Sequence, residues 1–196
     1  YLKHDTLNLD LPLQFGLSNK QLHLDPAQIG LNRYLFNVNG DAEVTENGDI
    51  HLDFGLNTNT LIIEDILTFL PEKVQQEMSI ISYAGKLTIA EAEVKGTYND
   101  SLRPSISAKV AANDATVNIP KLPHPFSAVN LDAVLELDLN KGIGNVEVNH
   151  LSTKFNRSHL SAKGLVNDFL GDIALKLNVI SDVPMGDVNR FLPQAI

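Results

Sequence analysis

The stretch Val38–Phe54 reads VNGDAEVTENGDIHLDF, and it carries the two signals that decide the fold. Apolar and polar residues alternate along it, and Asn-Gly pairs occur at Asn39-Gly40 and Asn47-Gly48. Successive side chains of a strand point to opposite faces, so the alternation predicts strands with one apolar face. Asn-Gly accepts the positive φ angles of tight hairpin turns, so both pairs are predicted to be turns around a strand of about six residues. Ile50–Leu56 is predicted to be the next strand.

The same alternation continues through most of the chain. Leu7–Leu17 and Val129–Leu139 each place six apolar residues on alternate positions. Pro12 cannot donate a ladder hydrogen bond, which favours an edge strand or a bulge at that position. Further alternating runs occur at Leu87–Val94, Ile106–Ala112, Ala115–Ile119, Val146–Val148, Leu160–Leu165 and Ile173–Val179. We therefore predict a mainly β fold: one large, curved antiparallel sheet of about a dozen strands, forming a partly closed groove with a few short amphipathic helices.

Helical periodicity is confined to short segments. Leu61–Leu70 has apolar residues at i, i+3, i+4 and i+7 spacing, which predicts an amphipathic helix that Pro71 ends. A second helix is predicted from Pro71 to Ile81. Near the C-terminus, Met185–Leu192 repeats the pattern of the first helix.

A seven-residue motif occurs twice. Asp65–Pro71 reads DILTFLP and Asp187–Pro193 reads DVNRFLP. With the Gly-Asp pairs upstream, these motifs define an internal repeat at about 36–71 and 159–193 within one β-rich region of 196 residues, a pattern typical of stacked units. The motif is predicted to be structural: the aspartates at helix N-termini, the phenylalanines buried, the prolines ending the turn. Its residues are Asp65, Phe69, Pro71, Asp187, Phe191 and Pro193.

The Pro-rich stretch 119–126, IPKLPHPF, is predicted to be an extended crossover between the two halves.

Composition excludes several classes of function. The net charge is -9 and no Lys/Arg cluster is present, which argues against a nucleic-acid partner. The absence of cysteine removes disulfides and thiolate metal sites. No run of eighteen apolar residues occurs, so no transmembrane helix is predicted. The sequence begins at Tyr1 with neither an initiator methionine nor a signal peptide, so we interpret it as part of a longer protein with its targeting segment upstream.

The sequence contains no pattern typical of an enzyme or a cofactor site. The six histidines are scattered without metal-ligand spacing, so no metal or other cofactor is predicted. Asp132, Glu136 and Asp138 alternate with an apolar row and are interpreted as its solvated face, not as a catalytic carboxylate pair. Lys141–Val146, KGIGNV, lacks the spacing of a phosphate loop and is predicted to be a turn.

An apolar sheet face of this size must be hidden from water. A second sheet, closure of the sheet on itself, or a non-protein ligand such as a lipid acyl chain would hide it. One hypothesis is therefore a lipid-binding groove, and the alternative is a structural or scaffolding domain with a closed apolar core and no ligand. The candidate lipid-facing residues are Leu7, Leu9, Leu11, Leu13, Phe15, Leu131, Leu135, Leu137, Leu139, Ile173 and Leu175.

Three passages together resemble the AsmA-like proteins of Gram-negative bacteria. They are GDIHLDFGLNTNTLIIEDILTFLP at Gly48–Pro71, the passage Gly85–Asp138 with its segment RPSISAKVAANDATVNIPKLPHPF, and LSAKGLVNDFLGDIALKLNVISDVPMGDVNRFLP at Leu160–Pro193. The resemblance covers nearly the whole chain. It rests on glycines, prolines and alternating leucines, with no invariant reactive residue among them.

The resemblance implies a location and a role. AsmA-like proteins are similar to TamB and to bridge-like lipid transfer proteins, whose repeated β units form a taco-shaped sheet with an apolar groove. It implies a periplasmic segment, joined to the rest of a longer chain and anchored to the inner membrane by an upstream helix. It also implies that the groove binds or conducts phospholipid between the inner and outer membranes in support of outer-membrane biogenesis.

Overall fold

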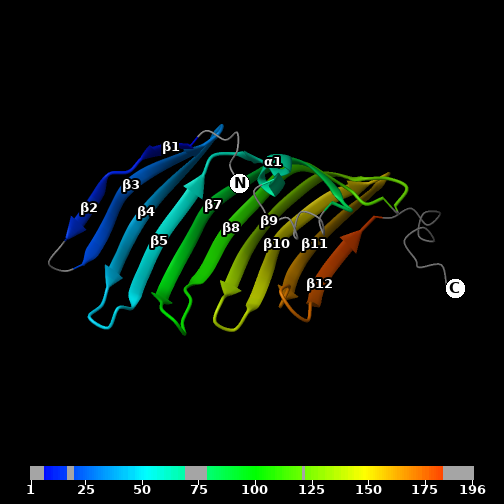
Figure 1. The fold of residues 1–196 in the computed structure, drawn as a ribbon. Coiled ribbons are helices and arrows are strands. Elements are labelled where there is room, and N and C mark those ends of the chain that lie inside the picture. The colour runs from blue at the N-terminus through cyan, green and yellow to red at the C-terminus, as the bar shows by residue number, and fades with distance from the viewer. Residues whose placement is uncertain (1–6, 17–19, 69–78, 121, 183–196) are drawn as a thin grey trace.

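The structure is a computed structural model that describes residues 7–16, 20–68, 79–120 and 122–182. Within them the chain forms a single antiparallel sheet of twelve strands and one short helix (Figure 1). The strands are β1 (Leu7–Asp10), β2 (Leu13–Gly16), β3 (Gln21–Leu31), β4 (Tyr34–Val44), β5 (Ile50–Thr58), β6 (Leu61–Ile62), β7 (Ser82–Tyr98), β8 (Ser105–Asn118), β9 (Phe126–Asp138), β10 (Ile143–Phe155), β11 (Ser158–Asn167) and β12 (Ala174–Ser181). The helix is α1 (Ile63–Thr68).

The topology is a meander in which neighbours in sequence are mostly neighbours in the sheet. The order is β1-β3-β4-β5-β7-β8-β9-β10-β11-β12, with β2 also on β3 and β6 also on β7. The sheet stays open, because β1 and β2 form one edge and β12 forms the other (Figure 1). The predicted fold, mainly β with one large curved antiparallel sheet, is therefore confirmed.

The first edge of the sheet is interrupted at Pro12. We predicted a single run over Leu7–Leu17, but the segment forms two four-residue strands, β1 and β2, that both pair with β3. Pro12 lies in the gap between them, at the edge of the sheet, where its missing N–H leaves no ladder bond unmade.

Only one of the two Asn-Gly pairs forms a turn. Asn47-Gly48 closes the β4–β5 hairpin, in which the Gly48 amide donates to the Thr45 carbonyl at 3.0 Å. The prediction of a turn at Asn39-Gly40 is wrong, because β4 continues through both residues. Gly40 has a φ of 143°, and a Cβ there would lie 2.1 Å from the Asp53 carbonyl oxygen of β5. The glycine is required by close strand approach and not by a turn.

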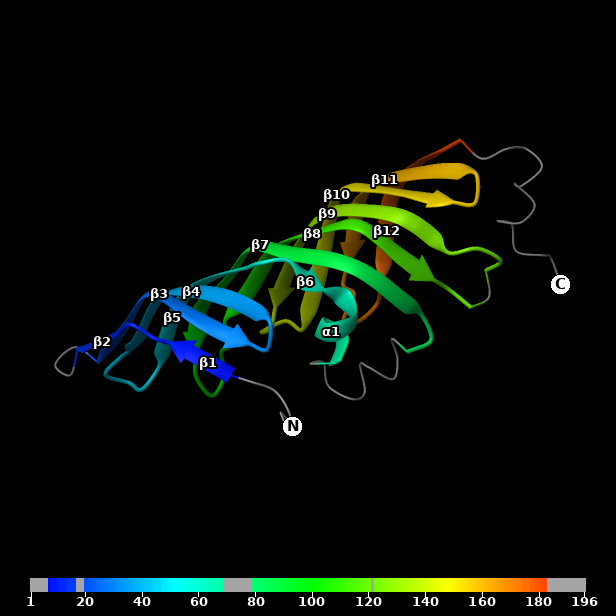
Figure 2. The same cartoon turned by 90° about the horizontal axis from the view of Figure 1, so that it is seen from above.

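Bulges bend the long strands. The pairing register shifts at Leu24/Ala27 in β3, at Ile89/Glu91 in β7 and at Val148/Leu151 in β10. Each shift falls near the middle of its strand, where an extra residue bends the strand and increases its twist. The strands consequently curve along their own length, and the sheet has a concave and a convex face (Figure 2).

The helical predictions are only partly met. The helix predicted at Leu61–Leu70 is present as α1, but Leu61 and Ile62 belong to β6, where Leu61 pairs with Leu87 of β7. Most of the second predicted helix and the whole of Met185–Leu192 lie outside the described residues. So do Phe69, Pro71, Asp187, Phe191 and Pro193, so their predicted structural roles stay predictions.

The two halves share local geometry at the level of single residues. The β3–β4 turn is Asn32-Arg33 and the β10–β11 turn is Asn156-Arg157, and both asparagines have positive φ, at 55° and 53°. Eight residues after each asparagine lies a glycine with nearly the same φ, Gly40 at 143° and Gly164 at 145°. Gly40 and Gly164 fall within the two predicted repeat units, and the two turns lie a few residues before them. The stretch 119–126 joins β8 to β9, which pair directly, so the sheet continues across it.

The buried residues are few and mostly small. The described apolar residues with less than a tenth of their surface exposed are Ala27, Tyr34, Leu61, Ala108, Ala112, Ala115, Ala133 and Phe155. A single layer has no second sheet to bury large side chains, so most of these buried residues are alanines, and Tyr34, Leu61 and Phe155 are the large exceptions. Most leucines and valines of the sheet remain half-buried or exposed.

Candidate functional site

One continuous apolar row crosses the sheet from β3 to β12. Residues paired directly across antiparallel strands lie on the same face of the sheet. Following the pairing from strand to strand gives a row of nine residues without a polar member: Ala27, Val38, Leu56, Ala92, Ala108, Leu135, Val146, Val166 and Leu175. With neighbouring strands about 4.8 Å apart, eight steps give an apolar track of roughly 38 Å.

The adjacent row, one residue along each strand, is polar and lies on the other face. It runs through Asn39, Gly55, Glu93, Ser107, Glu136 and Asn145. Ion pairs between neighbouring strands lie on this face, with Lys109 Nζ 2.5 Å from Glu91 Oε2 and Lys95 Nζ 3.6 Å from Asp53 Oδ1. The sheet is therefore amphipathic, with one face suited to water and one face suited to hydrocarbon.

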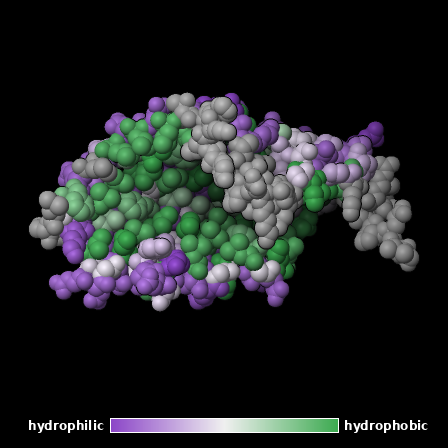
Figure 3. All heavy atoms as spheres, in the orientation of Figure 1, coloured by the Kyte–Doolittle hydropathy of each residue, from purple (hydrophilic) through white to green (hydrophobic). Residues whose placement is uncertain are grey.

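The apolar face is the hollowed one. Figure 3 shows hydrophobic side chains lining a hollow that runs along the sheet, with hydrophilic residues along its rims. We call this concave apolar face of β3–β12 the groove. The side chains on the floor of the groove are smallest at β7–β9. Ala92 pairs with Ala108 there, and Ala112 and Ala133 lie on the same face. Small residues there leave depth that leucines would fill.

The structure brings most of the predicted lipid-facing residues onto the groove face. Leu131, Leu135 and Leu137 lie on β9 opposite Ala112, Ala108 and Ile106. Leu175 on β12 lies opposite Val166.

At the other edge of the sheet, four predicted residues lie opposite leucine or isoleucine positions of β3. Leu7 and Leu9 of β1 pair with Leu31 and Ile29. Leu13 and Phe15 of β2 take register positions opposite Leu24 and Leu22.

Three predicted residues fall outside the strands. Leu11 lies between β1 and β2 and is 38% exposed, Leu139 follows β9 and is 40% exposed, and Ile173 precedes β12 and is 61% exposed. They belong to the rims of the sheet and not to the continuous row.

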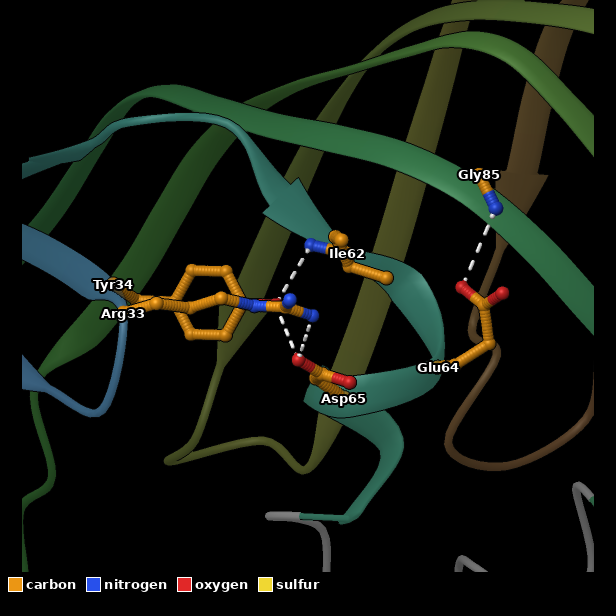
Figure 4. A network of polar contacts seen from close by, with 6 residues as sticks. All are labelled: Arg33, Tyr34, Ile62, Glu64, Asp65 and Gly85. Carbon is orange, nitrogen blue, oxygen red and sulfur yellow. Dashed lines mark hydrogen bonds and ion pairs between the residues drawn. The ribbon is translucent and has the colours of Figure 1, made fainter. Parts of the chain in front are cut away.

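The helix α1 is fastened at the rim of the groove by a polar network that no sequence pattern indicated (Figure 4). The buried Tyr34, at the start of β4, donates its hydroxyl to Asp65 Oδ2 at 2.6 Å and accepts from the Ile62 amide at 3.3 Å. Arg33 pairs with the same carboxylate. On the other side, Glu64 Oε2 accepts from the Gly85 amide of β7 at 3.3 Å.

These contacts favour the charged forms of both Asp65 and Arg33. Hydrogen bonding from Tyr34, helped by Arg33, lowers the pKa of Asp65, while partial desolvation opposes the shift. The same contacts raise the pKa of Arg33. Asp65 lies in the first turn of α1, as predicted, and its carboxylate also ties the helix to the β3–β4 turn.

No group of three or more histidine, aspartate or glutamate side chains in the described ranges could hold a metal ion. The carboxylates of Asp132 and Glu136 lie on the polar face, as the alternation predicted. No helix of the described part of the chain has the length and hydrophobicity needed to cross a membrane.

Sequence reasoning missed the direction of the groove. The alternating leucines suggested rows along single strands, whereas the longest unbroken apolar row runs across them. Alternation reports which face a side chain occupies, but it carries no register, and register decides which residues become neighbours. The signal that could have helped is the pair of Asn-Arg turns, which fixes the register of two hairpins.

A scan against protein-family models and searches of curated proteins and of solved structures find no match to this chain.

Proposed function

We propose that this chain is a non-enzymatic, AsmA-like segment that binds phospholipid acyl chains in its concave groove. We further propose that it works in the periplasm, as part of a longer protein held at the inner membrane, and helps phospholipid pass toward the outer membrane. The observation that carries the proposal is the nine-residue apolar row from Ala27 to Leu175, lying in a hollow that no second sheet of the described residues covers.

The energetics favour recognition of hydrocarbon. Each buried methylene contributes about 0.8 kcal/mol, so a fully buried chain of sixteen carbons would gain roughly 12 kcal/mol before ordering costs. A chain in an open groove keeps part of its surface in water, and its gain is correspondingly smaller. Even this smaller gain in free energy allows an acyl chain to bind without a specific headgroup contact.

The rims supply little to hold an anionic headgroup. Arg33 is paired with Asp65, and Lys141 Nζ lies 2.7 Å from Asp138 Oδ2. Arg103 donates to the backbone carbonyls of Asn99 and Leu102. With a net charge of -9, we expect the groove to select by acyl chain and to leave the headgroup in water.

The alternative, a closed apolar core without a ligand, has less support. A closed core requires the apolar face to meet a second layer or the sheet to pair edge to edge. In the described residues the two edges do not pair, and large apolar side chains stay open to solvent, including Phe15 at 59% and Leu175 at 64% exposed.

A matched pair of substitutions on β8 tests the proposal. Ala108 lies on the groove floor, and Ala111, three residues further, lies on the convex face opposite Asp132. The parent protein, purified without detergent, should carry phospholipid detectable by mass spectrometry of a solvent extract. Ala108→Asp places a charge in the apolar track and should remove that lipid, whereas Ala111→Asp should retain it.

Folding must be scored beside lipid content. Far-UV circular dichroism should show the same β content in the parent and in both variants. If the parent carries no lipid from the cell and takes none from phosphatidylcholine vesicles, the lipid-binding function is wrong. Loss of lipid in both folded variants would show that the groove face is not the site.

A further inference from the structure

One part of the groove is a pocket with an entirely uncharged lining. It has a volume of ≈ 390 Å³ and lies on the concave face between the ends of β8 and β9 and the strands β10–β12. Its lining includes Phe126, Thr153, Leu160, Ala162, Leu177 and Val179. This volume is within the roughly 300–1,000 Å³ of small-molecule sites.

The pocket makes no polar demand on an occupant. The buried Thr153 hydroxyl donates to the Ser127 carbonyl at 3.0 Å, so its hydrogen is already used. Any polar group placed in this pocket would exchange water for an apolar wall at a cost in free energy. The complementary ligand is therefore neutral hydrocarbon.

A second set of register shifts, on β8–β10, lies at this pocket. The β8–β9 register shifts at Ala112/Ala115 and Ala115/Val117, and the β9–β10 register shifts at Ser152/Lys154. Asp114 and Ala128, at φ of 51° and 49°, are the residues with left-handed backbone at these shifts. Bulges bend the strands that carry them, so this end of β8–β10 bends a second time.

Aromatic packing closes the end of this part of the sheet. The rings of Phe126 and Phe155 lie 5.0 Å apart, and His124 meets Phe155 edge-on at 6.0 Å. Phe155 is 3% exposed and Ser158, across the β10–β11 turn, is 1% exposed. The pocket wall formed by Phe126 is thus held by a packed turn and does not depend on a ligand.

We propose that this pocket holds the methyl-terminal part of one acyl chain of a phospholipid, and that it is the preferred resting position within the groove. The inference rests on the proposed function. Charge decides between the two sources of an acyl chain: a free fatty acid brings its carboxylate into a protein of net charge -9, whereas a zwitterionic phospholipid adds no net charge. The headgroup then lies outside the pocket, toward the open rim.

Spin-labelled lipid tests the position in the parent protein. Phosphatidylcholine with a doxyl group at carbon 16 or at carbon 5 of one chain is offered to isotope-labelled protein, and nuclear magnetic resonance follows the methyl signals. The 16-doxyl lipid should broaden Val179 and Leu160 several-fold more than Leu52 and Val94, which lie on the groove face of β5 and β7 and do not line the pocket. The 5-doxyl lipid should broaden Val179 less. If the 5-doxyl lipid broadens Val179 as much as the 16-doxyl lipid or more, the proposed orientation is wrong. If both lipids broaden signals uniformly along the groove, the preferred position is wrong.

A filling substitution tests the same point independently. Ala162→Phe fills the pocket, and Ala42→Phe makes the same change on the groove face of β4, opposite Leu22 and Leu52. Ala162→Phe should weaken phosphatidylcholine binding about tenfold and Ala42→Phe less than twofold. Equal weakening would refute the pocket and leave the groove function standing, whereas no binding by the parent would refute the proposed function itself.

Doxyl-labelled stearate tests whether the acyl chain in the pocket belongs to a phospholipid or to a free fatty acid. Stearate carrying the same 16-doxyl label should bind at least several-fold more weakly than the phosphatidylcholine at pH 8, where its carboxylate is charged. Tighter binding of stearate would assign the pocket to free fatty acid and overturn the phospholipid assignment.

Discussion

Replacing Gly40 or Gly164 by alanine should destabilise the protein in two ways. The new Cβ would overlap the neighbouring strand, and the backbone conformation is unfavourable for an L-residue. A Cβ at Gly40 would lie 2.1 Å from the Asp53 carbonyl oxygen and 2.7 Å from the Phe54 Cα. At Gly164 it would lie 2.1 Å from the Lys176 carbonyl oxygen. Both glycines also have φ near +145°, a conformation that L-residues rarely adopt.

The two contributions can be estimated separately. A glycine-only backbone conformation costs an L-residue about 1–3 kcal/mol, and relieving the overlap by moving a packed neighbour adds about 1–3 kcal/mol. Gly40 faces β5, which β7 holds from the other side, so the neighbour cannot move freely. Gly164 faces the edge strand β12, which can shift outward. Gly40→Ala should therefore cost about 4 kcal/mol, and Gly164→Ala about 2 kcal/mol.

The assay is equilibrium urea unfolding, with ΔG extrapolated to water for each variant. Gly142→Ala is the control, because Gly142 also has positive φ, at 66°, but a Cβ there meets nothing within 4 Å. It should cost only the backbone contribution, about 1–2 kcal/mol. If the loss of stability does not decrease from Gly40 to Gly164, or if Gly40→Ala costs no more than Gly142→Ala, the reasoning from strand approach is refuted.

Two further predictions concern the attachment of α1. Tyr34→Phe removes the hydroxyl that bonds Asp65 and the Ile62 amide, and should cost about 1–2 kcal/mol by thermal unfolding, with faster hydrogen exchange at Ile62; unchanged exchange would contradict it. The lowered pKa of Asp65 means that its contribution is present above the ordinary value of 3.8 and is lost as the pH falls through the lower folded value. Asp65→Asn should therefore reduce stability at pH 7 and flatten the stability change on acidification, and an unaltered acid profile would exclude this role.

Sequence alone was sufficient for the class of fold because alternation acts locally. The period of two in Ile50–Leu56 and in Leu131–Leu139 states which face each residue takes, whatever its neighbours are. The chemistry of Asn47-Gly48 is equally local, and it forms the predicted turn. The polar assignment of Asp132 and Glu136 followed from the same period.

The features that sequence missed depend on contacts between distant segments. Asn39-Gly40 has the composition of a turn, but pairing with both β3 and β5 keeps it extended, so tertiary context overrides local preference. The network of Tyr34 and Asp65 joins residues 31 positions apart and has no periodic signal. The position of the pocket depends on bulges at Asp114 and Ala128, and an aspartate or an alanine in a sequence does not by itself predict a bulge.

The orientation of the apolar row has a consequence for how such a molecule can change size. Since the row crosses the strands, the width of the hollow depends on strand length and on where the bulges fall, whereas its length depends on how many strands are present. One inserted or duplicated hairpin would lengthen the hollow by about 10 Å, two strand spacings, and leave its cross-section unchanged. The shared turn and glycine geometry at Asn32–Gly40 and Asn156–Gly164 is what such growth by duplication would leave behind. The length of the hollow can thus change by copying hairpins, and its width can change separately by moving bulges.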